Sequence, residues 1–276
     1  MKIKFVDIDG IRTRYLYEGD GPPLLLIHPV GTSGDMFCRN IDVLAKDFTV
    51  VCPDVLGHGW TGMIDLNDGP PQPEVVKHLG KLIDLLGFDE FYVGGNSYGG
   101  LLSSLLYFDR PTQVKKVVIM GSASTFHPPE EIAETIKGSF ANAMTAMQNP
   151  TWETAVKRLA NITFRKEATV PTEVILNQLT VYAMPDRIDA YRQTMEGMAG
   201  TADSKTVRVY HRLEEMNVPT LVIVGRNDIR ADWRWHEKGV ARMPNARIEI
   251  FEECGHLPQC EHPEKLNHLV REFLLD

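Results

Sequence analysis

The sequence predicts an α/β fold, in which a mostly parallel, eight-stranded sheet has helices on both faces and a helical lid insertion. Short, continuous apolar runs recur along the chain, as expected for strands that are covered on both faces. Segments with helical periodicity separate most of these runs, which is typical of strand–helix–strand units. One long segment has helical periodicity alone, and this indicates the insertion.

The eight expected strands differ in pattern. The first two, residues 3–8 and 11–18, alternate polar and apolar residues and are joined by the turn Asp9-Gly10. The other six are the continuous runs Leu24–Ile27, Phe48–Val51, Phe91–Val93, Val117–Met120, Leu221–Val224 and Ile248–Phe251. Helices are expected over residues 34–45, 73–87, 97–109, 234–242 and 262–274.

The expected insertion lies between the strands at 117–120 and 221–224. Prolines divide it into short helical segments, because proline cannot continue a helix; they are Pro128, Pro129, Pro150, Pro171 and Pro185. We therefore predict a core domain formed by residues 1–125 and 213–276, with residues 126–212 as a helical lid or cap over the strand ends.

Composition excludes several classes of protein. The 276 residues are 43% hydrophobic and 24% charged, which is typical of a folded globular chain. The net charge of −8 and the lack of a Lys/Arg-rich stretch argue against a nucleic-acid partner. No apolar run approaches the roughly 20 residues of a membrane helix, and the charged N-terminus does not resemble a signal peptide.

The four cysteines have neither Cys-x-x-Cys nor zinc-site spacing, which favours free thiols in a reducing compartment. We expect a soluble, cytoplasmic protein with a small-molecule partner, no membrane partner, and no metal or organic cofactor. The sequence provides no specific indication for or against a homodimer.

The strongest chemical signal is the segment Gly95–Gly99, Gly-Asn-Ser-Tyr-Gly, which matches the Gly-x-Ser-x-Gly nucleophile elbow. An expected strand precedes it and an expected helix follows, as this motif requires. Small residues two positions before and after Ser97 let the strand and the helix approach closely. The alternative is a glycine-rich turn at a helix start, which could hold an anion.

A serine hydroxyl needs a base within hydrogen-bond reach. His256 directly follows the last strand, at the same sheet edge as Ser97. His28 and His58 are weaker candidates because each lies in a loop to which a different role can be assigned, and His236 is expected to face solvent on a helix.

The base needs an orienting acid in turn. Asp228 follows the strand Leu221–Val224 and so reaches the same edge, whereas Asp232 lies farther from the strand end. A turn-forming Asp is the alternative for Asp228 alone. The chain order Ser, Asp, His is the one this type of site uses.

The negative oxygen formed on attack needs hydrogen-bond donors. The backbone N–H of Tyr98, directly after the serine, is one expected donor. The second is expected from the loop His28–Gly31. Pro29 has no N–H, so Val30 is the natural candidate. A purely structural turn is the alternative for this loop.

The motifs together resemble the α/β-hydrolase superfamily along the whole chain. The elbow, the His-x-x-Gly loop at 28–31, the segment Asp54–Thr61 and the segment Gly255–Pro263 all match common family segments. The resemblance implies a cofactor-independent serine hydrolase with Ser97, His256 and Asp228 as its triad.

Within that superfamily the chain is most similar to the meta-cleavage-product hydrolases, which split a carbon–carbon bond in vinylogous 1,5-diketones from aromatic ring breakdown. The similarity includes Asn96 before the nucleophile, the pair Gly99-Gly100, and the lid segments 150–153 and 172–185. It implies that His28, Asn96, Gln178 and Leu257 contact the substrate.

Three positions depart from that family's pattern. Gln178 stands where the family has an arginine that contacts a substrate carbonyl or carboxylate, Leu257 replaces a tryptophan, and the oxyanion loop has His-Pro instead of His-Gly. Glutamine cannot provide the charged, forked pair of donors that arginine has, so this position favours a less charged ketone, ester or lactone as the substrate. The alternatives to the carbon–carbon hydrolase are a carboxylesterase or lactonase, and a small-molecule receptor or cofactor-free oxygenase on the same fold.

Overall fold

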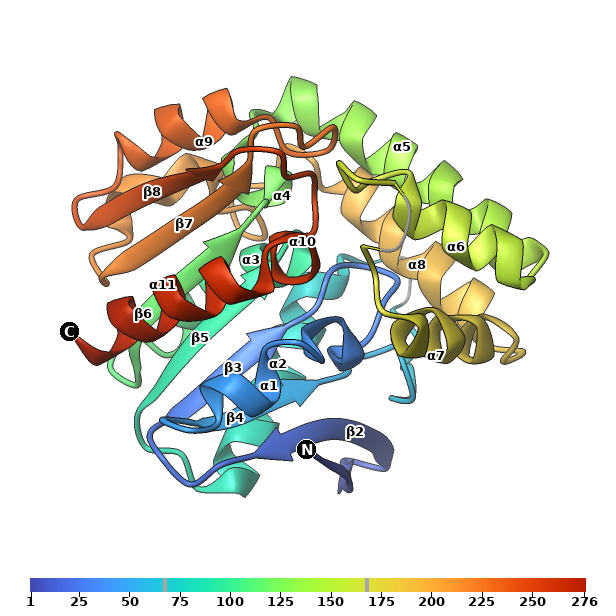
Figure 1. Cartoon of the computed structure of the whole chain (residues 1–276), viewed down its shortest axis with the longest axis horizontal. Coiled ribbons are helices and arrows are strands. Elements are labelled where there is room, and N and C mark those ends of the chain that lie inside the picture. The colour runs from blue at the N-terminus through green and yellow to red at the C-terminus, as the bar shows by residue number, and fades with distance from the viewer. Residues whose placement is uncertain (67–68, 167–168) are drawn as a thin grey trace.

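A computed structural model of the chain describes residues 1–66, 69–166 and 169–276. In this part of the chain one sheet of eight strands has the order β1-β2-β4-β3-β5-β6-β7-β8 (Figure 1). The pairs β1/β2 and β2/β4 are antiparallel, and the other pairs are parallel, which confirms the predicted architecture. The strands are β1 (Lys2–Ile8), β2 (Ile11–Glu18), β3 (Pro23–Ile27), β4 (Thr49–Pro53), β5 (Phe91–Asn96), β6 (Val114–Met120), β7 (Thr220–Gly225) and β8 (Ala246–Phe251).

Helices cover both faces of the sheet. One face packs against α1 (Ile41–Leu44) and α11 (Pro263–Leu275), and the other against α2 (Pro71–Leu86), α3 (Tyr98–Asp109) and α9 (Trp233–Val240). Successive strand residues point to opposite faces. In β3, Leu24 and Leu26 therefore join the core on the side of α1 and α11, while Leu25 and Ile27 join the core on the side of α2 and α3. This explains why the runs are apolar without interruption.

The helix expected over residues 34–45 is broken. A 3₁₀ turn, η1 (Gly34–Phe37), precedes the short α1. Buried polar groups at this point bond to other elements: the Gly34 N–H donates to Asp54, and Asn40 donates to Asn267 of α11 at 2.8 Å. The helix expected over residues 262–274 is present as α11, whose first residue is Pro263, and a short helix, α10 (Pro258–Glu261), precedes it.

The segment between β6 and β7 is helical. It contains α4 (Ala123–Phe126), α5 (Pro129–Gln148), α6 (Trp152–Ala160), α7 (Thr172–Tyr182), α8 (Arg187–Gly200) and the 3₁₀ turn η2 (Tyr210–Glu215). Pro129 begins α5 and Pro171 directly precedes α7, as the proline pattern predicts. Figure 1 shows α5 to α8 gathered beyond one end of the sheet. The exact domain boundaries stay a prediction.

The described part of the fold contains no membrane-spanning helix, no disulfide and no metal-binding cluster. None of the helices in the described ranges has the length and apolar character that crossing a membrane requires. Cys38, Cys52, Cys254 and Cys260 are free thiols. Outside residues 67–68 and 167–168, no three His, Cys, Asp or Glu side chains are grouped so that they could hold a metal ion.

Candidate active site

Ser97 lies at the sharp turn between β5 and α3. Its backbone angles, φ 57° and ψ −115°, are unusual for a residue with a side chain and indicate local strain of the kind found at functional turns. The flanking glycines permit this turn. A Cβ on Gly99 would lie 2.0 Å from the Ile27 carbonyl oxygen, and one on Gly95 would lie 2.3 Å from the Gly99 carbonyl carbon. The motif therefore needs glycine at both positions.

His256 and Asp228 contact each other through loops that follow β8 and β7. The Nδ1 atom of His256 lies 2.8 Å from Oδ2 of Asp228. Oδ1 of Asp228 accepts the backbone N–H groups of Arg230 at 2.7 Å and Ala231 at 3.0 Å. Because a carboxylate only accepts hydrogen bonds, the proton of the imidazole sits on Nδ1, and Nε2 is left as an acceptor.

Asp232 and His236, the alternatives to the predicted acid and base, have other roles. Asp232 caps α9 by accepting the Arg234 N–H, and its carboxylate pairs with the Arg234 side chain. The expectation that His236 faces solvent is wrong, since this residue is 0% exposed. Its ring packs against Phe126 with 4.7 Å between the ring centroids, because this side of α9 faces the core.

The backbone of His256 is held from two sides. Its N–H donates to the carbonyl of Ile162, in the segment after α6, at 2.8 Å. Its carbonyl accepts from Nδ2 of Asn96 at 3.0 Å. Oδ1 of Asn96 in turn accepts from Nε2 of Gln259 at 3.1 Å, and Asn96 is fully buried. Asn96 is thus a positioning residue for the histidine loop and not the substrate contact that the resemblance implied.

Glu261 organises the same loop. Its carboxylate accepts the backbone N–H groups of Gly255 at 3.0 Å and of Leu257 at 3.1 Å, on either side of His256. It also accepts the N–H of Phe164 at 2.8 Å, which lies between α6 and α7. A carboxylate that accepts several N–H groups fixes a loop strongly. This explains why the sequence motif around His256 includes Glu261.

The predicted oxyanion donors have free N–H groups. Neither the Val30 nor the Tyr98 N–H donates a hydrogen bond to another group of the described residues, and Val30 lines the pocket described below. The carbonyls of this loop are tied to the helical insertion instead. Arg158 of α6 donates to the Gly31 carbonyl at 2.7 Å and to the Val30 carbonyl at 3.3 Å. Tyr182 of α7 also donates to the Gly31 carbonyl, at 3.0 Å.

Two other predicted substrate contacts lie elsewhere. His28 is fully buried, with Nδ1 at 2.8 Å from the Pro29 carbonyl and Nε2 accepting the Val55 N–H at 3.1 Å. It therefore links two loops of the core. Gln178 is 1% exposed and does not line the pocket either. Leu257 is the one of the four that does, and it also packs against the helical insertion beside Leu159.

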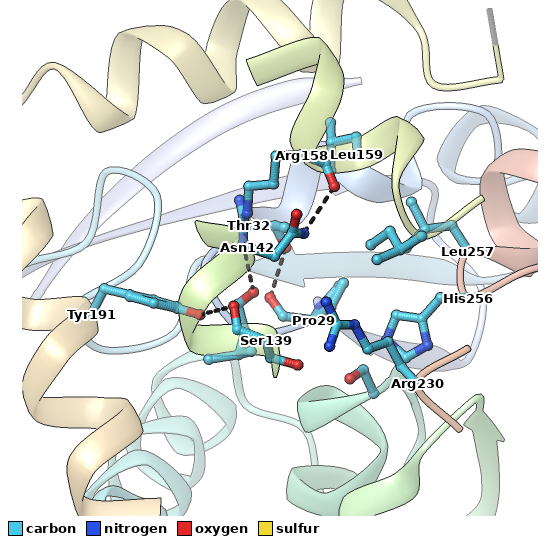
Figure 2. A pocket seen from close by; sticks show the side chains of 13 residues that line it. Pro29, Thr32, Ser139, Asn142, Arg158, Leu159, Tyr191, Arg230, His256 and Leu257 are labelled. Carbon is cyan, nitrogen blue, oxygen red and sulfur yellow. Dashed lines mark hydrogen bonds between the residues drawn. The ribbon is translucent and has the colours of Figure 1, made fainter. Parts of the chain in front are cut away.

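Ser97 and His256 line one pocket between the strand ends and the helical insertion (Figure 2). The pocket encloses about 430 Å³ of empty space, part of which is open to solvent. Its wall combines core loops with α5, α6 and α8, and its residues are Pro29, Val30, Thr32, Ser97, Ser139, Asn142, Arg158, Leu159, Ile162, Tyr191, Arg230, His256 and Leu257. Of the residues predicted from the sequence, Ser97, His256, Val30 and Leu257 thus meet at one cavity.

Two arginines in this wall were not predicted from the sequence. Figure 2 shows that Arg158 enters from the insertion and that Arg230 lies beside His256. Burial lowers the pKa of Arg158 to about 10, and the charge of Arg230 also lowers it. Burial likewise lowers the pKa of Arg230, although both groups remain cations at neutral pH. A signal for Arg230 was available, because it follows Asp228 by two residues at the same strand end.

These features define a class of protein. The model of the alpha/beta hydrolase fold family matches residues 22–263, and the chain belongs to this family. It is an α/β-fold hydrolase whose sheet order, strained serine turn and His–Asp pair agree with the match.

More particular relatives match the whole chain. The chain is 31% identical to a 2-hydroxy-6-oxononadienedioate/2-hydroxy-6-oxononatrienedioate hydrolase of Burkholderia vietnamiensis, over 98% of this chain and 95% of the relative. It is 28% identical to a 2-hydroxymuconate semialdehyde hydrolase of Pseudomonas putida, over 97% and 92%. The solved structure of a serine hydrolase involved in carbazole degradation, the CarC enzyme, superposes with a TM-score of 0.82 at 25% identity, covering 99% of this chain and 98% of that one. The chain therefore belongs with the meta-cleavage-product hydrolases, as the sequence motifs predicted.

Proposed function

We propose that this protein hydrolyses a carbon–carbon bond next to an activated carbonyl, in a vinylogous diketone of the ring-fission type, with Ser97, His256 and Asp228 as the catalytic triad. The observation that supports this most directly is the pocket itself. Ser97 on its strained turn and His256, with Nδ1 held by Asp228, line the same cavity under the helical insertion.

The chemistry begins with proton transfer. Nε2 of His256 takes the proton of the Ser97 hydroxyl while Oγ forms a bond to the substrate carbonyl carbon. The electron pair of the C=O bond moves to oxygen, and the N–H groups of Val30 and Tyr98 stabilise the resulting oxyanion. Such donors are each worth about 3–4 kcal/mol of barrier. Asp228 stabilises the imidazolium that has formed.

The bond between the former carbonyl carbon and its neighbour then breaks. Its electron pair passes to the carbon of the leaving dienolate, and His256 returns the proton to that carbon. Water next attacks the acyl group on Ser97 and gives a proton to His256, which passes it to the Ser97 oxygen as the acid product leaves. The proton first held by Ser97 ends on the carbon of the leaving group and a proton from water replaces it, so Ser97 and His256 return to their starting states and one water is consumed. None of these steps calls for a cofactor.

The choice of a carbon–carbon bond rests on the relatives. Their names specify hydrolysis of 2-hydroxy-6-oxo dienedioates and of a muconate semialdehyde, and the alignments extend over nearly the full length of the chain. An ester or lactone would require the same nucleophile and oxyanion donors, with an alkoxide as leaving group. An esterase is therefore an outcome of the test below.

The test compares kcat/KM for 2-hydroxy-6-oxonona-2,4-dienedioate with that for p-nitrophenyl acetate. We expect the dienedioate to be the better substrate, and Ser97→Ala to lower turnover of both by at least about 10⁴-fold, because triad members act as a unit. A higher kcat/KM for the ester would identify an esterase. Full activity of Ser97→Ala would contradict the proposed mechanism.

The remaining expectations belong to this proposal. A small carbonyl compound is the partner, without nucleic acid or membrane, and the location is the cytoplasm. A homodimer would be compatible with the proposed chemistry, since every proposed catalytic residue belongs to one chain.

A further inference from the structure

The pocket has a charge opposite to that of the whole molecule. The chain carries a net charge of −8, yet the residues that line the pocket include Arg158 and Arg230 and no Asp or Glu. Asp228 lies behind His256 with its side chain 0% exposed, and its two oxygens are occupied by the imidazole and by two backbone N–H groups. A ligand in the cavity therefore meets two cations and no exposed carboxylate.

The two arginines differ in what they already bind. The guanidinium of Arg158 donates to the carbonyls of Gly31 and Val30 and lies over the ring of Tyr182, so its role is in large part to hold the oxyanion loop. The guanidinium of Arg230 has no hydrogen-bond or ion-pair partner within residues 1–66, 69–166 and 169–276. A half-buried guanidinium with free donors costs free energy unless an acceptor arrives.

The position of Arg230 directs it to the substrate. It follows Asp228 by two residues, and its backbone N–H donates to that carboxylate, so its main chain is fixed beside the triad. Arg230 also lines an outer cleft of about 870 Å³, together with His127 and Trp233, and thus forms the wall between the cleft and the active-site pocket. Its side chain can serve a ligand in the inner pocket without leaving the catalytic loop.

We propose that Arg230 binds a carboxylate of the substrate and is the residue by which the enzyme distinguishes acidic from neutral carbonyl compounds. This inference rests on the proposed hydrolase function and assigns to its site a residue that determines substrate specificity. A guanidinium offers a carboxylate two parallel N–H donors, a geometry that a lone ammonium lacks. Arg158 adds to the positive potential of the site. This proposal differs from the expectation, drawn from Gln178, that a less charged substrate is favoured.

Two ester substrates with acyl chains of equal length provide the test. Mono-p-nitrophenyl glutarate ends in a carboxylate where p-nitrophenyl pentanoate ends in a methyl group. We expect the wild type to prefer the acidic ester, and Arg230→Gln to lower its kcat/KM by about 100-fold, mainly through KM, because a charged contact made equally in ground and transition states is lost. The neutral ester should change by less than about threefold. Arg230→Lys should restore part of the preference.

Arg234→Gln is the matched control. Arg234 lies four residues away on the same segment, but its side chain is 66% exposed and pairs with Asp232 in the outer cleft. We expect this variant to behave as the wild type with both esters. The inference is overturned if Arg230→Gln leaves the preference unchanged, or if it slows both esters equally.

A second variant moves Arg230 without changing any charge. A Cβ on Gly138, in α5, would lie 2.2 Å from Nη1 of Arg230, while the next atoms of that side chain are at 3.5 Å and beyond. Gly138→Ala should therefore displace the guanidinium and reduce the preference for the acidic ester by about tenfold. Unchanged preference in a folded Gly138→Ala protein would count against the inference.

Binding separates this inference from the proposed function. Calorimetric titration of glutarate into Ser97→Ala needs no turnover. We expect glutarate to bind to Ser97→Ala and not to the double variant Ser97→Ala/Arg230→Gln. If neither ester is hydrolysed but glutarate binds through Arg230, the hydrolase proposal fails and the anion site stands. If esters are hydrolysed and glutarate binds equally well without Arg230, the anion site fails alone.

Discussion

Asn96 shows how a single buried amide can connect two loops of the site. Nδ2 donates to the carbonyls of Met120 and His256, and Oδ1 accepts from Gln259, so every strong hydrogen-bonding direction but one is used. The amide thus ties the strand that leads to Ser97 to the loop that carries His256. Because these groups are buried, loss of one partner leaves others unsatisfied.

We expect Asn96→Ala to lower kcat by about 10–100-fold with little change in KM, because the His256 loop loses one of its anchors while the pocket wall keeps its residues. Gln259→Leu, which removes only the contact to Oδ1, should have a smaller effect. Steady-state kinetics on one substrate provide the comparison. A larger effect on KM than on kcat would instead indicate a substrate contact.

The residues of the proposed triad could be selected from the sequence because each follows a strand run, and the carboxyl ends of parallel strands meet at one edge. Ser97, Asp228 and His256 all satisfy this rule. The role of Asn96 could not be predicted in this way. Its partner Gln259 is distant in sequence, and an amide before the nucleophile is compatible with either a pocket or a buried network. Arg158 depends on how α6 docks on the oxyanion loop, which no local pattern encodes.

At the scale of elements, α3 packs very close against the sheet. The backbone of Gly99 lies against the end of β3, and Gly100 lies against Ser122 after β6, where a Cβ would be 2.8 Å from the Ser122 Cβ. Glycine disfavours a helix interior by about 1 kcal/mol relative to alanine. The close contact of helix and sheet therefore outweighs helix propensity at these positions, and it places Ser97 at the strand end.

Gly99→Ala should destabilise the protein by about 3 kcal/mol, because its Cβ would overlap the Ile27 carbonyl, which is backbone and cannot turn aside. Gly200 provides the control, since it ends α8 and has no atom within 4 Å of a Cβ. Gly200→Ala should be neutral or stabilise by up to about 1 kcal/mol. Urea unfolding of the two variants tests this pair. Equal stabilities would show that the close packing of α3 is not required.

The elements themselves could be predicted to different degrees. The starts of helices in the insertion can be predicted from its prolines, because a proline fixes where a helix can start, as at Pro129 and Pro171. The prediction of one helix over 34–45 was wrong, although its apolar residues have helical spacing. The helix is broken because Gly34 and Asn40 form hydrogen bonds with distant partners. Tertiary hydrogen bonds of this kind override local periodicity.

At the scale of the whole molecule, several histidines are buried without a counter-charge in contact. Burial lowers the pKa of His28, that of His58 to about 3, and that of His236 to about 4. An unfolded chain binds a proton at each near pH 6.5. Between pH 6.5 and about 4 the unfolded state therefore binds more protons than the folded state, and stability falls as pH falls.

We expect the free energy of unfolding to decrease from pH 7 to 5.5 by about 1 kcal/mol for each such histidine. His236→Leu should make the decrease shallower, because one proton fewer is taken up on unfolding. His268→Leu is the control, since its side chain is 81% exposed. Urea unfolding at a series of pH values measures the effect. Stability that is constant from pH 7 to 5.5 would show that these histidines can be charged in the folded state.

The central claim is that His256 activates Ser97 in the pocket that both residues line. The most direct measurement is the rate and site of labelling by a fluorophosphonate, followed by mass spectrometry of the labelled peptide. We predict that the label is found on Ser97 of the wild type and forms at least about 100-fold more slowly in His256→Ala. An unlabelled Ser97 in the wild type, or equal rates in the two proteins, would contradict the account.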